Sequence, residues 1–113
     1  MAIKQVTTFV NFDSLDIRAG KIIDVDNAQT KKPTYRITID LGPEIGRKVS
    51  CGAYRSYAKD YLLGKTVVCI VNLGPKKMGP ETSEVLILGI ANAQGETIFL
   101  TTDSDVPMGS PAF

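Results

Sequence analysis

Residues 34–41, with the sequence TYRITIDL, constrain the fold most strongly, because apolar and polar side chains alternate along the whole segment. A period of two places successive side chains on opposite faces of a β-strand, so that one face is buried and the other meets water. The apolar face consists of Tyr35, Ile37, Ile39 and Leu41. We therefore predict a mostly β fold, in which a sheet packs one face against an apolar core.

Four further segments have the length and apolar content of strands. They are residues 17–26, 47–52, 66–71 and 83–88. Residues 53–63, between the third and fourth strands, place tyrosines at helical spacing and end before Gly64, which predicts a helix. Its tyrosines, Tyr54, Tyr57 and Tyr61, are predicted to plug the core rather than to stack on bases. This order is typical of an OB-fold, a five-stranded partly open barrel with a helix between strands 3 and 4, although a generic α+β sheet gives the same order.

Two extensions flank the predicted barrel. At the N-terminus, residues 11–16 predict one helical turn that is capped by Asn11 or Asp13. A hairpin turning at residues 93–96 follows the last barrel strand, and an acidic tail, residues 103–113, ends the sequence. The apolar side chains of this tail fit two alternatives, which are association with a second copy and attachment to the same barrel.

Length and composition exclude several classes of function. A chain of 113 residues has room for one domain, which we assign to residues 1–113 with a core of residues 12–110. Histidine is absent and the two cysteines, Cys51 and Cys69, lie far apart, so we expect free buried thiols, no metal site and no cofactor. No pair of carboxylates stands out for acid–base catalysis, and we predict a binding protein rather than an enzyme.

No segment of the sequence has the features of a membrane anchor or of a secretory signal. The strongest apolar run, residues 67–71, is far shorter than the ~18 residues that a membrane span needs. The N-terminus, MAIKQVTTFVNFD, lacks a basic region followed by a long apolar stretch. We therefore expect a cytoplasmic protein that does not insert into membranes.

The basic residues are distributed unevenly along the chain. Residues 1–77 contain all 13 Lys and Arg with 7 Asp and Glu, a net charge of +6, whereas residues 78–113 contain 5 acidic residues and no basic one. Two basic patches result, the pair Lys76–Lys77 in a loop spanning residues 72–82, and a rim near the connection of the first two strands. This rim consists of Lys31, Lys32 and Arg36.

In an OB-fold, those two connections flank the usual binding face, so the patches are able to converge on one phosphate backbone. By pattern alone, a hairpin end kept in solvent by two lysines is the slightly favoured interpretation of Lys76–Lys77. Convergence of the two patches would favour binding. The sequence thus leaves both interpretations open.

Two long motifs resemble a known family. FDSLDIRAGKI and VNLGPKKMGPETSEVLILG are similar to the opening and to the strand-loop-strand motif of tRNA-binding modules, which occur as free-standing proteins and appended to some aminoacyl-tRNA synthetases. The closing VPMGS resembles the tail of the same modules, so the resemblance extends from Phe12 to Ser110. It implies an OB-fold and tRNA contacts from the residues that match the motif. These residues are Asn72, Lys76, Lys77 and Ser83.

Within that family, KKPTYRITIDLGPEIG and SEVLILG resemble the CsaA-type branch of small stand-alone proteins described as export-related chaperones. The resemblance implies a non-enzymatic homodimer, joined through its N- and C-terminal elements, that binds unfolded or precursor polypeptides; the alternative partner is tRNA. It does not indicate which residues form a peptide pocket. Glu84 stands where the synthetase-linked modules have a neutral amide, and we expect its charge to weaken RNA contacts.

Overall fold

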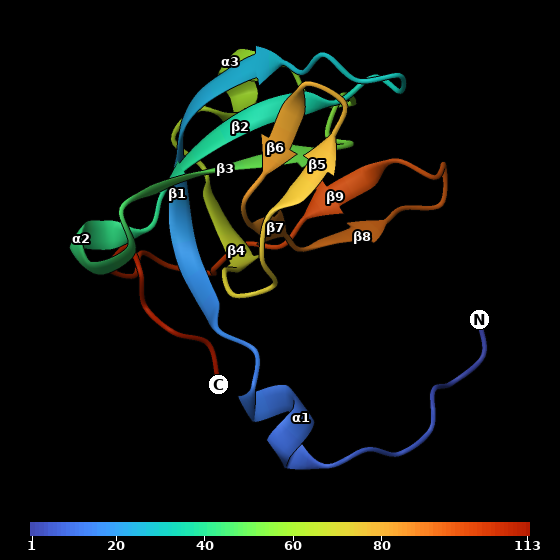
Figure 1. Cartoon of the computed structure of the whole chain (residues 1–113), viewed down its shortest axis with the longest axis vertical. Helices are drawn as coiled ribbons and strands as arrows, with labels where there is room; N and C mark the ends of the chain where they lie inside the picture. The colour runs from blue at the N-terminus through green and yellow to red at the C-terminus, as the bar shows by residue number, and fades with distance from the viewer.

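Five antiparallel strands form a nearly closed barrel in the computed structural model, which describes residues 1–113 (Figure 1). Their order in the sheet is β3-β2-β1-β4-β7, with neighbours hydrogen-bonded to one another. The predicted OB-fold is therefore confirmed. The bounds of the strands are β1 Ile17–Asn27, β2 Tyr35–Asp40, β3 Arg47–Gly52, β4 Thr66–Ile70 and β7 Leu86–Ile87.

Strand β1 closes the barrel because it pairs with a different strand along each half. Its first half, Ile17–Lys21, pairs with β4, and its second half, from Lys21 onward, pairs with β2. At the change of partner, Gly20 packs so tightly that a Cβ atom there would clash with the side chains of Ile39 and Leu41. Only glycine fits this bend without displacing the core.

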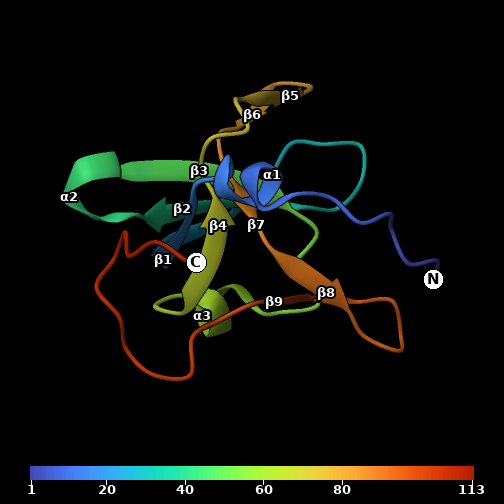
Figure 2. The same cartoon turned by 90° about the horizontal axis from the view of Figure 1, so that it is seen from below.

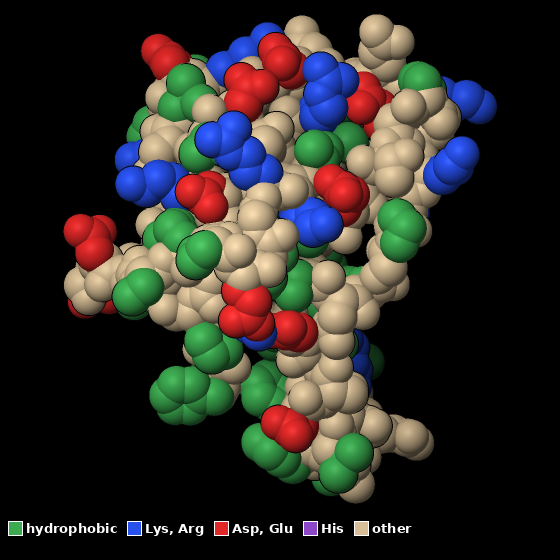
Figure 3. All heavy atoms as spheres, turned by 60° about the vertical axis from the view of Figure 1, so that its left-hand side comes forward, with side chains coloured by type: hydrophobic (Ala, Val, Ile, Leu, Met, Phe, Trp, Pro, Cys, Tyr) green, Lys and Arg blue, Asp and Glu red, His purple; other side chains and the backbone are tan.

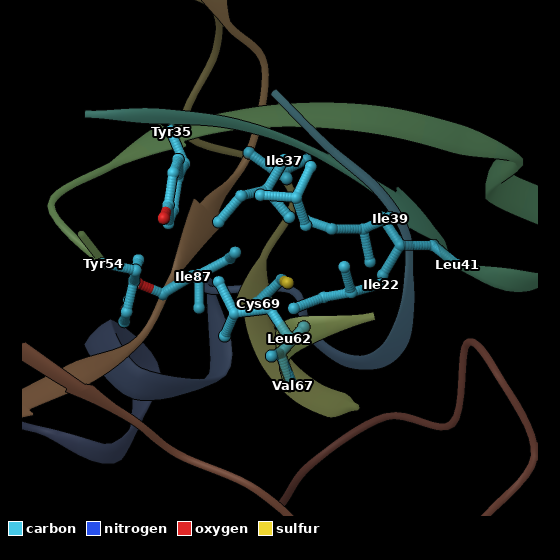
Figure 4. Packing of buried hydrophobic residues seen from close by; sticks show 12 residues of the cluster. Ile22, Tyr35, Ile37, Ile39, Leu41, Tyr54, Leu62, Val67, Cys69 and Ile87 are labelled. Atoms are coloured by element: carbon cyan, nitrogen blue, oxygen red, sulfur yellow. The ribbon is translucent and has the colours of Figure 1, made fainter. Parts of the chain in front are cut away.

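The alternation in residues 34–41 is confirmed, because the apolar side chains face the barrel interior and are buried. Figure 4 shows these side chains pointing toward those of the facing strands. The hydroxyl of Tyr54 donates a hydrogen bond of 3.1 Å to the Ile87 carbonyl, so this buried polar atom is satisfied. The core cluster is Ile22, Val25, Tyr35, Ile37, Ile39, Leu41, Tyr54, Leu62, Val67, Cys69, Val85 and Ile87.

Both cysteines are free, as predicted; Cys69 is buried in the core and Cys51 is half-buried. Burial raises the pKa of the Cys69 thiol from 9.0 to about 12. The folded state therefore holds this proton more tightly than the unfolded chain, so the resulting stability is present below pH 9 and is lost as the pH rises toward 12.

We expect the free energy of unfolding to fall by about 2 kcal/mol more in the wild type than in Cys69→Ala between pH 8 and pH 10.5. The difference between the two proteins contains the Cys69 thiol and its contribution to the raised pKa of Tyr54, while Cys51 is present in both. Urea unfolding at the two pH values measures the difference. Parallel pH dependences in the two proteins would rule out a proton-linked role for this thiol.

The predicted helix over residues 53–63 is mostly wrong, since only α3, Lys59–Leu62, is helical. Tyr54 enters the core and Tyr57 forms a turn by donating its N–H to the Tyr54 carbonyl, while the Tyr57 carbonyl accepts the Tyr35 hydroxyl. These bonds replace the helical ladder before Lys59. Packing of Tyr54 in the core therefore overrides the helical spacing.

The other helices are also short. α1, Phe9–Asp13, begins earlier than predicted and follows Thr8, so that neither Asn11 nor Asp13 caps it. α2, Gly42–Ile45, forms within the predicted turn between the second and third strands. No helix is long and apolar enough to cross a membrane.

Two small hairpins complete the fold. β8, Gly89–Ala91, and β9, Thr97–Phe99, pair across the predicted turn at residues 93–96. The predicted loop 72–82 and strand 83–88 are instead a hairpin of β5, Lys76–Met78, and β6, Glu81–Ser83, followed by β7. A glycine and a proline turn this hairpin, and residues 84–85 leave it to reach β3.

The acidic tail is attached to the same barrel through backbone bonds of residues 109–112. Gly109 donates its N–H to the Ala19 carbonyl at 2.8 Å, and Ala19 donates to the Ser110 carbonyl at 3.0 Å. Ala112 donates to the Ile17 carbonyl at 2.8 Å. The tail thus covers the edge of β1 that β2 leaves free, as the position of the C-terminus beside β1 in Figures 1 and 2 shows.

Candidate functional site

The β5–β6 hairpin stands out from the barrel beyond β3 (Figure 2). Its base is fixed to β3 by side chains. The Ser83 hydroxyl accepts a hydrogen bond of 3.0 Å from the Cys51 N–H and donates one of 3.2 Å to the Val85 carbonyl. The Glu84 carboxylate accepts the Val49 N–H at 3.0 Å, while the Glu84 N–H donates to the Val49 carbonyl at 2.7 Å. Residues 83–85 thereby connect to β3 and close the barrel on the side where β3 has no regularly paired neighbouring strand.

The hydrogen bond from the Val49 N–H holds the Glu84 carboxylate against β3. This carboxylate also lies 4.0 Å from the ammonium of Lys48. The negative charge that we expected to oppose RNA is therefore partly neutralised within the fold, and its hydrogen bond to Val49 has a structural purpose.

Arg36, one of the three residues in the predicted basic rim, is neutralised by acidic neighbours. Its guanidinium lies 3.0 Å from the Glu81 carboxylate and 3.7 Å from that of Asp26. The bonds to Glu81 raise the pKa of Arg36, so its charge is permanent, but these partners compensate it. Little of this charge is available to an external anion.

Four of the exposed lysines that have no ion pair lie on two neighbouring segments. Lys31 and Lys32 lie in the β1–β2 loop, and Lys76 and Lys77 lie on β5. A cleft of about 780 Å³ separates that loop from the hairpin tip, with Lys31 and Lys32 among its lining residues. The hairpin side of the lining consists of Met78, Gly79 and Pro80. We call this the lysine cleft.

The two basic patches therefore converge in part, as the OB-fold interpretation required. Lys31 and Lys32 line the cleft itself, while Lys76 and Lys77 precede its hairpin wall on the same short strand. All four lysines are exposed and have no ion pair, while Lys76 and Lys77, as neighbours on β5, point to opposite faces of that strand.

The same hairpin borders a second, apolar cleft of about 420 Å³. Leu73 and Leu86 line it although their side chains are 56% and 46% exposed, respectively. Lys76 and Glu84 also line this groove, and Met78 lines both this groove and the lysine cleft. The other apolar residues of the lining are Pro75 and Val85. We call this the apolar groove.

Comparison with known proteins identifies the family. The model of a family described as "Putative tRNA binding domain" matches residues 17–111. The chain belongs to the tRNA-binding domain family. The predicted family resemblance is thus confirmed, and the matched residues include the barrel and its hairpin.

Among solved structures, this tRNA-binding domain is similar to the chaperone CsaA from Bacillus anthracis str. Ames, with 30% identity and a TM-score of 0.90. It is also similar to the CsaA chaperone protein from Picrophilus torridus, with 35% identity and a TM-score of 0.90. In each case the match covers 96% of this chain and 100% of the other. The chain is therefore a CsaA-like member of the family.

Curated relatives include much longer enzymes. The methionine–tRNA ligase of Chloroherpeton thalassium is 32% identical over 109 residues, which are 96% of this chain but 15% of that enzyme. That of Thermococcus onnurineus is 38% identical over 103 residues. This domain thus spans about one-seventh of the ligases that it matches, and corresponds to one part of them.

Two of the four motif residues of this tRNA-binding domain have engaged side chains. The Asn72 amide oxygen accepts the Asp16 N–H at 2.8 Å, and its amide nitrogen donates to the Ser14 carbonyl at 2.9 Å. The hydroxyl of Ser83 is engaged with β3, as described above. Lys76 and Lys77 are therefore the motif residues whose polar groups point to solvent without a partner.

Sequence reasoning left the peptide pocket unassigned and missed the apolar groove. Leu73 lies in a segment with turn residues, and Leu86 lies in an apparently continuous apolar strand. The groove arises only because the chain before and after the hairpin comes together, so that Leu73 and Leu86 line one cleft. A signal was available in Leu73, an apolar residue in an otherwise polar connection.

Proposed function

We propose that this CsaA-like protein is a non-enzymatic chaperone that binds unfolded or export-destined polypeptides. The apolar groove beneath the β5–β6 hairpin is the observation that carries the proposal, because an exposed apolar cleft suits side chains that are buried in folded clients. The similarity over full length to structures named as chaperones supports it.

The hairpin offers a mode of binding for an extended chain. β5 pairs with β6 on one side, so its other edge has backbone N–H and C=O groups to pair with a peptide strand. A peptide added there would place alternate side chains toward Leu73 and Leu86, while Lys76 contacts its backbone or an acidic side chain.

The direct test is whether the purified protein delays aggregation of a chemically denatured client protein and binds an unfolded peptide by calorimetry. We expect delay at stoichiometric amounts, and a negative heat-capacity change because apolar surface is buried. Failure in both measurements would eliminate the chaperone function.

The lysine cleft favours tRNA as a second candidate partner. We propose that Lys76 and Lys77, with Lys31 and Lys32, contact phosphates and recognise the shape of folded RNA. Asn72 and Ser83 would contribute by holding the hairpin and its connection in place, through the bonds described above. The family match supports this candidate.

A side-by-side titration of folded tRNA and an unfolded peptide at two salt concentrations separates the candidates. Binding to tRNA falls steeply with added salt because counterions are released. Binding of an apolar peptide changes little. Both responses together would mean that one protein binds both partners.

We further propose that the protein is a cytoplasmic homodimer with one domain of residues 1–113 and a core of residues 12–110. Figure 3 shows hydrophobic side chains gathered over the lower part of the molecule, where Figure 1 places α1. No residue of α1 is buried, and Phe9 and Val10 are 72% and 73% exposed. Burial of this helix in a second copy would remove that surface from water.

The double change Phe9→Asp with Val10→Asp is expected to convert a dimer to a monomer, because two charges would enter the contact. Light scattering coupled to size exclusion measures the mass. Leu63→Asp with Ile90→Asp, which also introduces two aspartates at exposed aliphatic positions, is the matched control and should remain dimeric. A wild-type protein of monomer mass would refute the dimer.

A further inference from the structure

Glu81 is a buried carboxylate beside the lysine cleft. It is only 8% exposed and lies opposite Met78 in the β5–β6 hairpin. One carboxylate oxygen accepts the Gln29 N–H at 2.8 Å and the Arg36 guanidinium at 3.0 Å; the other lies 3.3 Å from the same guanidinium nitrogen. The bond from Gln29 and the pairing with Arg36 lower the pKa of Glu81. The group is therefore ionised at neutral pH.

These bonds join the two walls of the lysine cleft. Gln29 begins the loop segment that carries Lys31 and Lys32, while Glu81 belongs to the hairpin that carries Lys76 and Lys77. The Gln29–Glu81 bond is the one hydrogen bond in which a hairpin side chain reaches this loop, since the other side-chain bonds of the hairpin reach Arg36 on β2, Cys51 on β3 or Val85. Without it, the loop and the hairpin tip have no polar connection.

Fixed walls matter because binding by flexible lysines loses conformational entropy for each side chain and loop that becomes ordered. If the distance between the two lysine-bearing segments is already fixed, the loop loses no further conformational entropy on binding. Arg36 is itself a poor phosphate ligand, because Glu81 and Asp26 compensate its charge. Arg36 instead holds the Glu81 carboxylate in the position from which it accepts the Gln29 N–H.

We propose that Glu81 is a positioning residue for polyanion binding, which holds the Lys31–Lys32 and Lys76–Lys77 pairs at one separation so that both engage the same phosphate backbone. This inference rests on the RNA-binding candidate function. It has an unusual consequence: removal of a negative charge beside the cleft weakens polyanion binding, whereas general electrostatics predicts the opposite.

The test compares Glu81→Gln with Glu96→Gln, which makes the same change of charge in the exposed turn of the β8–β9 hairpin. Each protein is titrated with labelled tRNA and with inorganic polyphosphate over a series of salt concentrations. We expect Glu81→Gln to bind roughly three- to tenfold more weakly, with a shallower salt dependence. Glu96→Gln should bind as well as the wild type or slightly better.

Two further measurements separate positioning from loss of folding. Thermal unfolding by circular dichroism reports whether Glu81→Gln is folded, and amide exchange reports on the Gln29 N–H, which should exchange faster in the variant. In the wild-type background, Lys31→Ala/Lys32→Ala and Lys76→Ala/Lys77→Ala are made separately and together. If Glu81 couples the two lysine pairs, the fold-increase in Kd of the combined variant differs from the product of the fold-increases of the two separate variants.

The outcomes distinguish the inference from the function on which it rests. A wild-type protein that binds neither polyanion overturns both. Normal wild-type binding with equal or tighter binding by Glu81→Gln overturns the positioning role and leaves RNA binding intact. If Glu81→Gln does not fold, independent losses from the two lysine pairs overturn the positioning role instead.

Discussion

Alanine at both lysine pairs, the pair that lines the lysine cleft and the pair on β5, is expected to weaken tRNA binding roughly a hundredfold near physiological salt. Lys31, Lys32, Lys76 and Lys77 are exposed and have no ion pair within the protein, so their charges are available to phosphates. Loss of four phosphate contacts should also reduce the slope of log affinity against log salt by about 3 to 4. Fluorescence anisotropy with labelled tRNA over a salt series measures both quantities.

The matched control removes four exposed cations from other surfaces. Lys4, Lys21, Arg47 and Lys59 are exposed and also have no ion pair, so their replacement by alanine makes the same change in net charge. We expect at most a severalfold loss in this protein, from the long-range field alone. Equal losses of tRNA affinity in the two quadruple variants would show that binding depends on the net charge of the protein and that the lysine cleft is not a specific binding site.

The barrel was predictable because its signals are local. Residues 34–41 show a period of two, and that period survives folding as the buried and half-buried faces of β2. Gly64, with a φ of 81°, ends α3 as predicted. Such features depend on neighbours in the chain and are therefore visible in the sequence.

The hairpin was not predictable, because contacts between distant residues stabilise its three-residue strands. Residues 72–82 contain glycines and prolines that are typical of a loop, and nothing local favours strands there. The bonds from Glu81 to Gln29 and from Ser83 to Cys51 connect residues 52 and 32 positions apart. Only the folded barrel brings these groups together.

The same reason explains which parts of the candidate site were found. Lysine pairs are visible in any sequence, and Lys31–Lys32 and Lys76–Lys77 do lie on the two segments that border one cleft. The neutralisation of Arg36 is not visible, because its acidic partner Glu81 is 45 positions away. The apolar groove likewise depends on Leu73 and Leu86, from opposite sides of the hairpin in the sequence, lining one cleft.

The second large effect is expected in the apolar groove, where Leu73→Asp with Leu86→Asp should weaken binding of an unfolded peptide at least roughly tenfold. The two leucines are half exposed in the free protein, so a bound peptide would bury their remaining apolar surface. Aspartate removes that gain and makes the peptide cover a charged group. Calorimetric titration and the delay of client aggregation both measure the loss.

Leu63→Asp with Ile90→Asp is the control, because it changes two exposed aliphatic side chains of the same size outside the groove and the same net charge. This control should protect clients like the wild type. If it loses protection to the same extent, general surface hydrophobicity rather than the groove captures the client. The groove variant should also retain most of its tRNA affinity, since neither leucine lines the lysine cleft. If the groove variant loses affinity for both the peptide and tRNA, the two ligands bind one shared surface of the hairpin. Met78, which lines both clefts, would lie at the centre of that surface.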